Sequence, residues 1–262
     1  MIPTEGVMGK TMALFLPRKT KDYVLSGRLM DSFVLIDYDN VPYQFRRSGL
    51  ADLARRVNAV LAPLVPGADS IFIRLYGGWY DSSGLTREGT RITQEIGQSF
   101  PLIELKNGRI HSRTSCEIAS ALIDCPVDIF QFTFRKRSGM RSPLISAKPQ
   151  NCVSVQNCTV SAVARWSRRG CPEPGCPATQ HDAFTYHEQK LVDTLLCCDL
   201  LGLAGRSPAP PVSVVSDDDD FAPALLMAAR LGATVHLVEM RATKGRVYGN
   251  LFGRYKVKVV NL

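Results

Sequence analysis

The fold is decided by one stretch of sequence, Phe33-Val34-Leu35-Ile36-Asp37-Tyr38-Asp39-Asn40. Its four consecutive apolar residues lack polar alternation, a pattern typical of a strand covered on both faces in a parallel sheet. Polar residues follow at once, and in open α/β sheets the ligand crevice lies outside the carboxyl ends of the strands. We therefore expect Asp37, Asp39 and Asn40 at a site. The stretch alone also fits a turn, because Asp and Asn side chains bond to nearby backbone.

A second apolar run ends in acidic residues in the same way. Pro211 to Ser216 predicts another buried strand, which leads into four aspartates, Asp217 to Asp220, and then into a helical pattern from Ala222 to Leu231. One or two acids would suffice to cap that helix. Carboxylates packed so closely repel each other unless a cation lies between them, so the excess favours a Mg²⁺ or Mn²⁺ site.

A third segment supplies a further acid. His187 to Leu200 has the spacing of a helix, on which Lys190 and Asp193 share one face beside the main apolar stripe. An ordinary Lys–Asp pair on a wet surface is the alternative interpretation. Asp199 lies about 120° around the same helix, so it should not reach a metal that Asp193 binds.

Together these motifs resemble the NYN domain family of PIN-like nucleases. The matching segments, in the family's order, are Phe33 to Asn40, Tyr76-Gly77-Gly78-Trp79, Lys190-x-Val192-Asp193, and Ser216-x-Asp218-x-Asp220-Phe221. The resemblance implies a PIN-like, three-layer α/β fold and a nuclease that depends on Mg²⁺ or Mn²⁺. RNA is the expected substrate and single-stranded DNA the second.

The resemblance also implies roles for particular residues. Four acids would bind the metal and act in catalysis, and Asn40 would lie beside them to orient water or phosphate; the acids are Asp37, Asp193, Asp218 and Asp220. Asp217 stands where the family usually has Gly, so the sequence leaves open whether an extra charge impairs activity.

Two other functions remain open. Ile36 to Val41 also fits the start of a haloacid-dehalogenase-type phosphatase, with Asp37 as nucleophile, Asp39 as acid, Lys190 as charge partner and Asp217-Asp218 as metal ligands. That family has a flap hairpin after its first strand, whereas Pro42 predicts an immediate helix here. The third function is a catalytically inactive NYN protein that binds nucleic acid.

The charge balance favours a polyanionic partner. The chain has 262 residues, 45% of them hydrophobic and 21% charged, with a formal net charge of +8. Clusters of basic residues could follow a phosphate backbone, and those expected to bind nucleic acid are Arg46, Arg47, Arg135, Lys136, Arg137 and Lys190. The apolar run from Met12 to Leu16 is too short for a signal peptide or a membrane span, so we expect a cytoplasmic protein without a membrane partner. A homo-oligomer is left open.

The alternation of predicted strands and helices divides the chain into four parts. We expect an N-terminal extension (1–30), a core (31–137 and 183–240), a Cys-rich insertion (138–182) and a basic C-terminal hairpin (241–262). Besides the segments above, the core should contain helices at 42–64, 83–97 and 115–123, strands at 70–76, 101–105, 127–134 and 234–239, and a hairpin turn at Asn107-Gly108. This rhythm predicts a mostly parallel sheet with helices on both faces.

The insertion contains candidate zinc ligands, namely Cys152, Cys158, Cys171, Cys176 and His181. A segment with few apolar residues needs a covalent or metal link, and reducing conditions argue against disulfides, so we predict a structural Zn²⁺ bound by thiolates. The spacings lack close C-x2-C pairs, and the alternative is that these cysteines are small buried residues, as expected for the other four.

Overall fold

The computed structural model describes residues 30–106, 109–126, 130, 132–139, 159–171, 173–241 and 248–262. A seven-stranded sheet forms its centre, in the order β11-β10-β9-β1-β2-β6-β5. All neighbours pair in parallel except β5 with β6. The strands are β1 (Met30–Asp37), β2 (Ala68–Tyr76), β5 (Leu102–Lys106), β6 (Arg109–Ile118), β9 (Val212–Val215), β10 (Val235–Glu239) and β11 (Lys258–Asn261). The predicted mostly parallel α/β sheet is confirmed.

The strand order creates a switch point beside β1. The chain leaves β1 towards β2 and β6, and later returns on the other side of β1 through β9, β10 and β11. Asp37 pairs with Tyr76 of β2, and Ile36 pairs with Val215 of β9, so the ends of the three strands are level. Ligands of doubly wound sheets bind at such a switch point, at the carboxyl ends of the strands.

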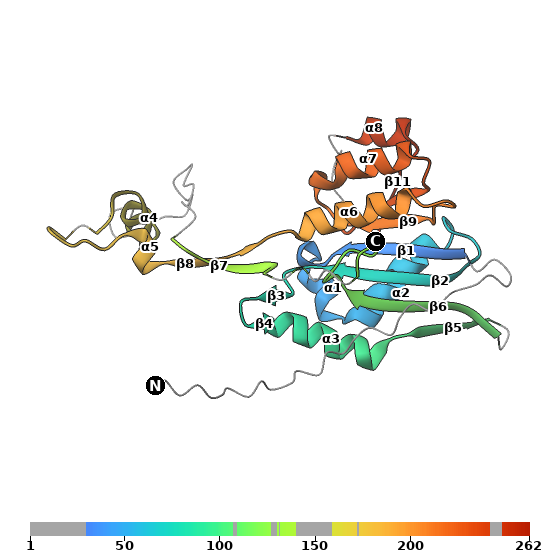
Figure 1. The fold of residues 1–262 in the computed structure, drawn as a ribbon, viewed down its shortest axis with the longest axis horizontal. Helices are drawn as coiled ribbons and strands as arrows, with labels where there is room; N and C mark the ends of the chain where they lie inside the picture. The colour runs from blue at the N-terminus through green and yellow to red at the C-terminus, as the bar shows by residue number, and fades with distance from the viewer. Residues whose placement is uncertain are drawn as a thin grey trace, which may run out of the picture.

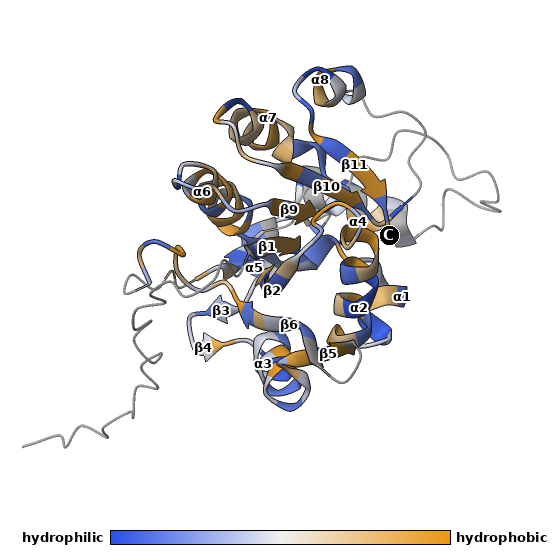
Figure 2. Cartoon of the chain, turned by 90° about the vertical axis from the view of Figure 1, so that its right-hand side faces the viewer, coloured by the Kyte–Doolittle hydropathy of each residue, from blue (hydrophilic) through white to orange (hydrophobic). Residues whose placement is uncertain are grey.

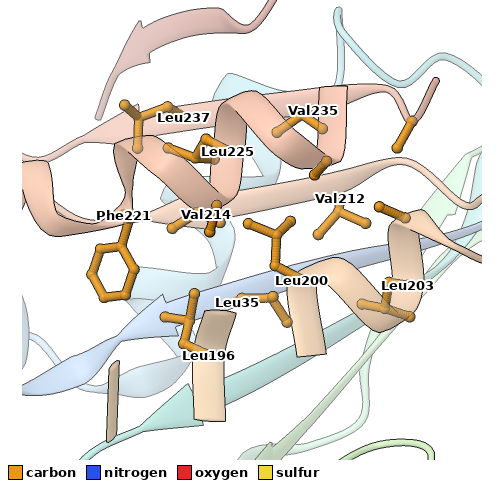
Figure 3. Packing of buried hydrophobic residues seen from close by; sticks show 14 of the residues in the cluster. Leu35, Leu196, Leu200, Leu203, Val212, Val214, Phe221, Leu225, Val235 and Leu237 are labelled. Atoms are coloured by element: carbon orange, nitrogen blue, oxygen red, sulfur yellow. The ribbon is translucent and has the colours of Figure 1, made fainter. Parts of the chain in front are cut away.

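Helices cover both faces of the sheet (Figures 1 and 2). One face packs against α1 (Tyr43–Arg47), α2 (Leu50–Leu61) and α3 (Arg87–Ser99), and the other against α6 (Val192–Ala204), α7 (Ala222–Arg230) and α8 (Gly249–Arg254). Figure 3 shows Leu196 and Leu200 of α6 and Leu225 of α7 over Leu35 and Val214 of the sheet. Burying each such side chain contributes about 1.5–3 kcal/mol, which explains why these apolar runs dictate the layers.

Two predicted helices differ from the structure in their bounds. The helix expected at 42–64 is two helices, because Gly49 adopts a left-handed conformation (φ +91°) between α1 and α2. The helix expected from Ser83 begins at Arg87, where the Thr86 side chain caps it by accepting the Gly89 N–H at 3.1 Å. Residues before the cap form a short hairpin of β3 (Tyr80–Asp81) and β4 (Gly84–Leu85).

The predicted helix at 115–123 is wrong, because residues 109–118 form strand β6. In β6 the hydroxyl of Thr114 is buried and accepts a hydrogen bond from the Asn58 side chain of α2 at 2.9 Å. Antiparallel pairing of Lys106 with Arg109 confirms the hairpin between β5 and β6, although Asn107-Gly108 lies outside the described residues. The strand predicted at 127–134 overlaps β7 (Phe134–Ser138) only at Phe134, and residues 127–129 and 131 are not described.

The start of the third predicted helix also needs correction. Residues 187–189 belong to strand β8 (Thr185–Gln189), which pairs antiparallel with β7 in a separate two-stranded sheet. Helix α6 begins only at Val192, after Leu191 adopts a left-handed conformation (φ +69°). Lys190 therefore lies on the connection and does not share a helix face with Asp193.

The predicted C-terminal hairpin is wrong as well. In the described residues 248–262, helix α8 leads into β11, which extends the sheet by pairing parallel to β10. Within the insertion, residues 159–169 form α4 (Thr159–Arg169) and residues 180–183 form α5 (Gln180–Ala183). Among the helices that the structure describes, none combines the length and apolarity needed to cross a bilayer.

Candidate functional site

Asp37 occupies the centre of the carboxyl edge. Its side chain is only 1% exposed, and its Oδ2 accepts hydrogen bonds from Asn40 Nδ2 (2.7 Å) and Ser216 Oγ (2.8 Å). Burial raises the pKa of the Asp37 carboxyl, whereas the two hydrogen bonds oppose that rise. The two donors come from η1 (Tyr38–Asn40), which follows β1, and from the end of β9, so both sides of the switch point fix this carboxylate.

The loop after β9 continues the hydrogen-bond chain. Ser216 Oγ accepts the N–H of Asp218 at 3.0 Å, and Asp218 Oδ1 accepts the N–H of Asp220 at 2.9 Å. Asp218 thereby caps the short helix η2 (Asp219–Phe221) that precedes α7. The capping role expected from the sequence accounts for one acid of the four. Asp220 is exposed beside it.

Asp193 faces this cluster from the first turn of α6. Partial burial raises the pKa of its carboxyl, and the negative charges of Asp37, Asp218 and Asp220 raise it further. The structure thus brings together the four acids predicted from the sequence, close enough to repel one another. In the described part of the chain, no three Asp, Glu, His or Cys side chains are already gathered around one metal position.

Asp199, six residues later on α6, has a separate role. It is 3% exposed and accepts the Tyr76 hydroxyl (2.6 Å) and the Ile123 N–H (2.8 Å). The guanidinium of Arg74 forms an ion pair with it at 3.4 Å and also contacts Glu117 of β6. The separation from Asp193 predicted from helical geometry agrees with this arrangement, in which Asp199 ties α6 to β2.

Asp217, the departure from the family pattern, turns away from the cluster. Its Oδ1 accepts the N–H groups of Met240 (2.7 Å) and Arg241 (3.2 Å), which follow β10. The side chain therefore joins the loops after β9 and β10.

Asp39 lies at the same edge on the side of α1 and α3. Its Oδ2 accepts the N–H of Gly78 at 2.9 Å. Burial raises the pKa of its carboxyl to about 6, and the Asp37 charge adds to the rise while Arg46 opposes it. Of the predicted nucleic-acid-binding residues, Arg46 is thus close to Asp39, and Arg47 is exposed in the same last turn of α1.

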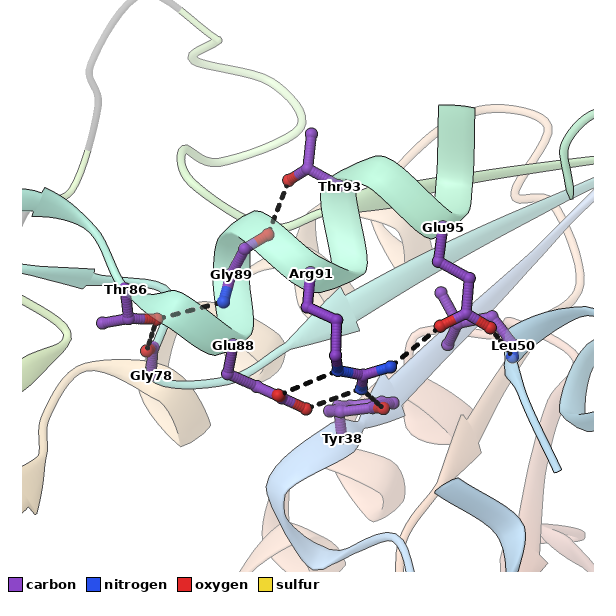
Figure 4. A network of polar contacts seen from close by, with 9 residues as sticks. All are labelled: Tyr38, Leu50, Gly78, Thr86, Glu88, Gly89, Arg91, Thr93 and Glu95. Carbon is purple, nitrogen blue, oxygen red and sulfur yellow. Dashed lines mark hydrogen bonds and ion pairs between the residues drawn. The ribbon is translucent and has the colours of Figure 1, made fainter. Parts of the chain in front are cut away.

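A polar network holds η1 in place (Figure 4). Arg91 of α3 donates to the Tyr38 hydroxyl at 3.0 Å and forms ion pairs with Glu88 (2.7 Å) and Glu95 (3.0 Å). The other oxygen of Glu95 accepts the N–H of Leu50 at the start of α2. Because Tyr38 lies between Asp37 and Asp39 and is 1% exposed, this network fixes the backbone that carries both acids.

Four of the predicted basic residues lie on or next to the β7–β8 ribbon. Glu188 forms ion pairs with Lys190 (3.0 Å) and Arg137 (3.1 Å), and the Arg135 Nε donates to the Phe132 carbonyl at 2.9 Å. Lys136 is exposed. Lys190 lies on the connection that leads into α6 and Asp193, whereas the other three lie on β7, so none of the four forms part of the acidic cluster.

The zinc prediction remains a prediction. Cys152 and Cys158 lie outside the described residues, whereas Cys171 and Cys176 are free thiols and His181 is exposed. The backbone N–H of Glu173, and after it the Cys176 thiol, lower the pKa of Cys171.

Sequence reasoning missed two residues that organise this edge. Ser216 bridges Asp37 and Asp218, and its position directly after a buried strand was the available signal. Thr133 is fully buried and accepts the N–H of Tyr80 on its hydroxyl (3.0 Å) and that of Lys190 on its carbonyl (2.9 Å), which only the fold reveals. In comparisons with known proteins, no family model, curated protein or solved structure matches this chain.

Proposed function

We propose that this protein is a metal-dependent nuclease of the PIN-like, NYN kind that hydrolyses phosphodiester bonds in RNA. The observation that carries the proposal is the meeting of Asp37, Asp193, Asp218 and Asp220 at the switch point of the sheet, where their charges act on one another. Parallel strands with acids at this edge also support the PIN-like classification.

The donor chemistry fits a hard divalent cation. Carboxylate oxygens are the ligands that Mg²⁺ and Mn²⁺ prefer, and a bound cation would relieve the repulsion that raises the pKa of Asp193. The four aspartates would hold it, and Asp37 is the one among them whose carboxylate is fixed by two side-chain hydrogen bonds. Such an ion supplies an activated water and neutralises charge on the phosphate.

The remaining residues have supporting roles that do not depend on the ion. Ser216 and Asn40 both donate to one oxygen of Asp37 and so hold the carboxylate in a single orientation. Positioning of this kind through a neighbouring hydrogen bond is typical of the residues behind metal ligands. Arg46 lies close to Asp39 at the edge, and Lys136 and Lys190 lie on or next to the β7–β8 ribbon; all three would attract the phosphate backbone.

The phosphatase alternative receives less support. Residues 38–47, all of them described, form η1 and α1 where that family has a hairpin. Asp39 accepts the Gly78 N–H on the other side of the strand end, and Lys190 is paired with Glu188.

The experiment is cleavage of labelled RNA, single-stranded DNA and duplex DNA in Mg²⁺, in Mn²⁺ and in chelator. We expect cleavage of RNA that the chelator stops and that Asp37→Asn or Asp218→Asn reduces to background. Asp69→Asn, at the opposite end of β2, is the matched control and should cleave like the wild type. Unchanged cleavage by Asp37→Asn would refute the proposal. Binding without cleavage would identify an inactive binder, and phosphate release from monoesters alone would favour the phosphatase.

A further inference from the structure

A β-ribbon arm projects from the core beside the acidic edge (Figure 1). We define the arm as residues 132–190, of which the structure describes β7, β8, α4, α5 and their neighbours. The paired strands β7 and β8 are not joined to the seven-stranded sheet, and α4 and α5 lie at their far end. At the near end, the Thr133 carbonyl accepts the Lys190 N–H, and three residues later the chain reaches Asp193.

The arm carries most of the net charge of the protein. Residues 132–190 contain nine Lys and Arg against three Asp and Glu, which gives +6 of the chain's +8. Among the described basic side chains, Lys136, Arg165 and Arg169 are exposed and appear in no ion pair. An excess concentrated on a projecting element indicates a polyanionic ligand more specifically than the overall charge does.

The far end of the arm contains an aromatic cavity. Its volume is about 660 Å³, and Trp166, Phe184 and Val163 line it together with Arg165 and Arg169. The rings of Trp166 and Phe184 pack edge to face with centroids 5.1 Å apart, and both side chains remain partly exposed. Aromatic rings between exposed guanidinium groups are the combination that takes unpaired bases, because bases stack on the rings while phosphates contact the cations.

We propose that the arm binds single-stranded nucleic acid, with one or more bases in the cavity beside Trp166 and the backbone along Arg165, Arg169 and the basic strand β7. The bound nucleic-acid strand then runs towards the acidic cluster at the near end of the arm. A duplex binds less well, because its bases are already stacked and paired and cannot enter the cavity. The proposal deepens the proposed function, on which its significance rests, but binding itself requires neither metal nor cleavage.

The first test measures binding of labelled single-stranded RNA to the full chain by fluorescence anisotropy, in chelator. Arg165→Glu with Arg169→Glu should weaken binding by about tenfold or more, because a stacking platform and its cations contribute that much per base. Arg113→Glu with Arg230→Glu makes the same charge change at exposed positions of β6 and α7, away from the arm, and should stay within about twofold of the wild type. Equal losses in the two double variants, or no loss in either, would overturn the proposal.

The second test uses the two tryptophans of the chain. Trp79 is fully buried in the core, so a ligand-dependent change of tryptophan fluorescence reports on Trp166. We expect RNA to quench this fluorescence in the wild type and not in Trp166→Phe, which keeps a ring for stacking and should keep its affinity. Trp166→Ala should lose both the fluorescence quenching and the affinity for RNA. Inorganic polyphosphate, which has charge without bases, should bind without quenching; equal quenching by polyphosphate and RNA, or none by RNA, would reject base stacking.

Both tests separate this proposal from the proposed function. Binding that depends on the arm, without cleavage in Mn²⁺, would leave the arm as a strand-binding surface and refute the nuclease. Cleavage by the wild type, together with arm variants that bind as tightly as the wild type, would support the nuclease and refute the arm as the binding surface. Thermal unfolding of each variant, followed by circular dichroism, shows whether it is folded.

Discussion

Two aspartates on helix α6 should respond differently to substitution by asparagine, Asp199 in stability and Asp193 in cleavage. Asp199→Asn removes the charge beside Arg74, which is 8% exposed. Arg74 then keeps the Ala121 carbonyl and, as its ion-pair partner, Glu117, whose side chain is 63% exposed. An exposed partner contributes about 0–1 kcal/mol, whereas unpairing a buried charge costs about 3–5 kcal/mol. We expect Asp199→Asn to lower the free energy of unfolding by about 3 kcal/mol and Tm by about 6–12 °C.

Asp193→Asn is the matched change on the same helix. Residue 193 is exposed and its carboxyl only partly buried, and loss of the favourable helix dipole there is offset by relief from three neighbouring negative charges. Its unfolding free energy should therefore stay within about 0.5 kcal/mol of the wild type, while cleavage falls to background. Urea unfolding and RNA cleavage of both variants provide the measurements. Equal stability of Asp199→Asn and the wild type, or equal destabilisation by the two substitutions, would refute this account of the helix.

Three further outcomes are expected. Mn²⁺ at about 100 times its Kd should stabilise the wild type by about 2.7 kcal/mol in thermal unfolding and should not stabilise Asp37→Asn; an equal shift in both would place the ion elsewhere. Ser216→Ala should reduce Mn²⁺ affinity, measured by calorimetry, by about 10- to 100-fold, because it orients Asp37; unchanged affinity would contradict that role. Folding raises the pKa of Asp39 to about 6, so the folded state binds the extra proton between pH 4 and 6, and this carboxyl lowers stability as pH rises through that window. Asp39→Asn should remove this loss. In urea unfolding from pH 4 to 7, the free energy of unfolding of Asp39→Asn relative to the wild type should therefore increase with pH. A difference that does not change with pH would contradict the raised pKa of Asp39.

The central sheet could be predicted because its strands are apolar runs with simple boundaries. Apolar residues fill most of the buried positions of β1, β2, β9 and β10, and the buried polar exceptions, such as Arg74 and His236, do not interrupt these runs. Only the end of β6, residues 115–118, was mistaken for a helix, because Glu117 finds its partner, Arg74, on the neighbouring strand β2. A partner that comes from another strand leaves no signal in local periodicity.

The acidic positions followed from the same logic, whereas their connections did not. Asp37 and Asp218 could be placed because each follows a buried strand, and strands of one parallel sheet end at one edge. The Ser216 bridge and the Asp217 contacts with Met240 and Arg241 depend on β9 lying between β1 and β10. Likewise, residues 187–189 read as the start of a helix because nothing local reveals that β7, some fifty residues earlier, supplies a pairing partner.

The hydrogen bond between Thr133 and Lys190 makes the arm a separable module. The chain leaves the core and re-enters it at two residues already in contact, 2.9 Å apart from nitrogen to oxygen. A short turn between these points could therefore replace the intervening residues without stretching the backbone on either side. In such an architecture the acidic edge and the arm can be changed independently, so a chain with a turn in place of the arm should keep the acidic edge intact and lose only the proposed binding surface.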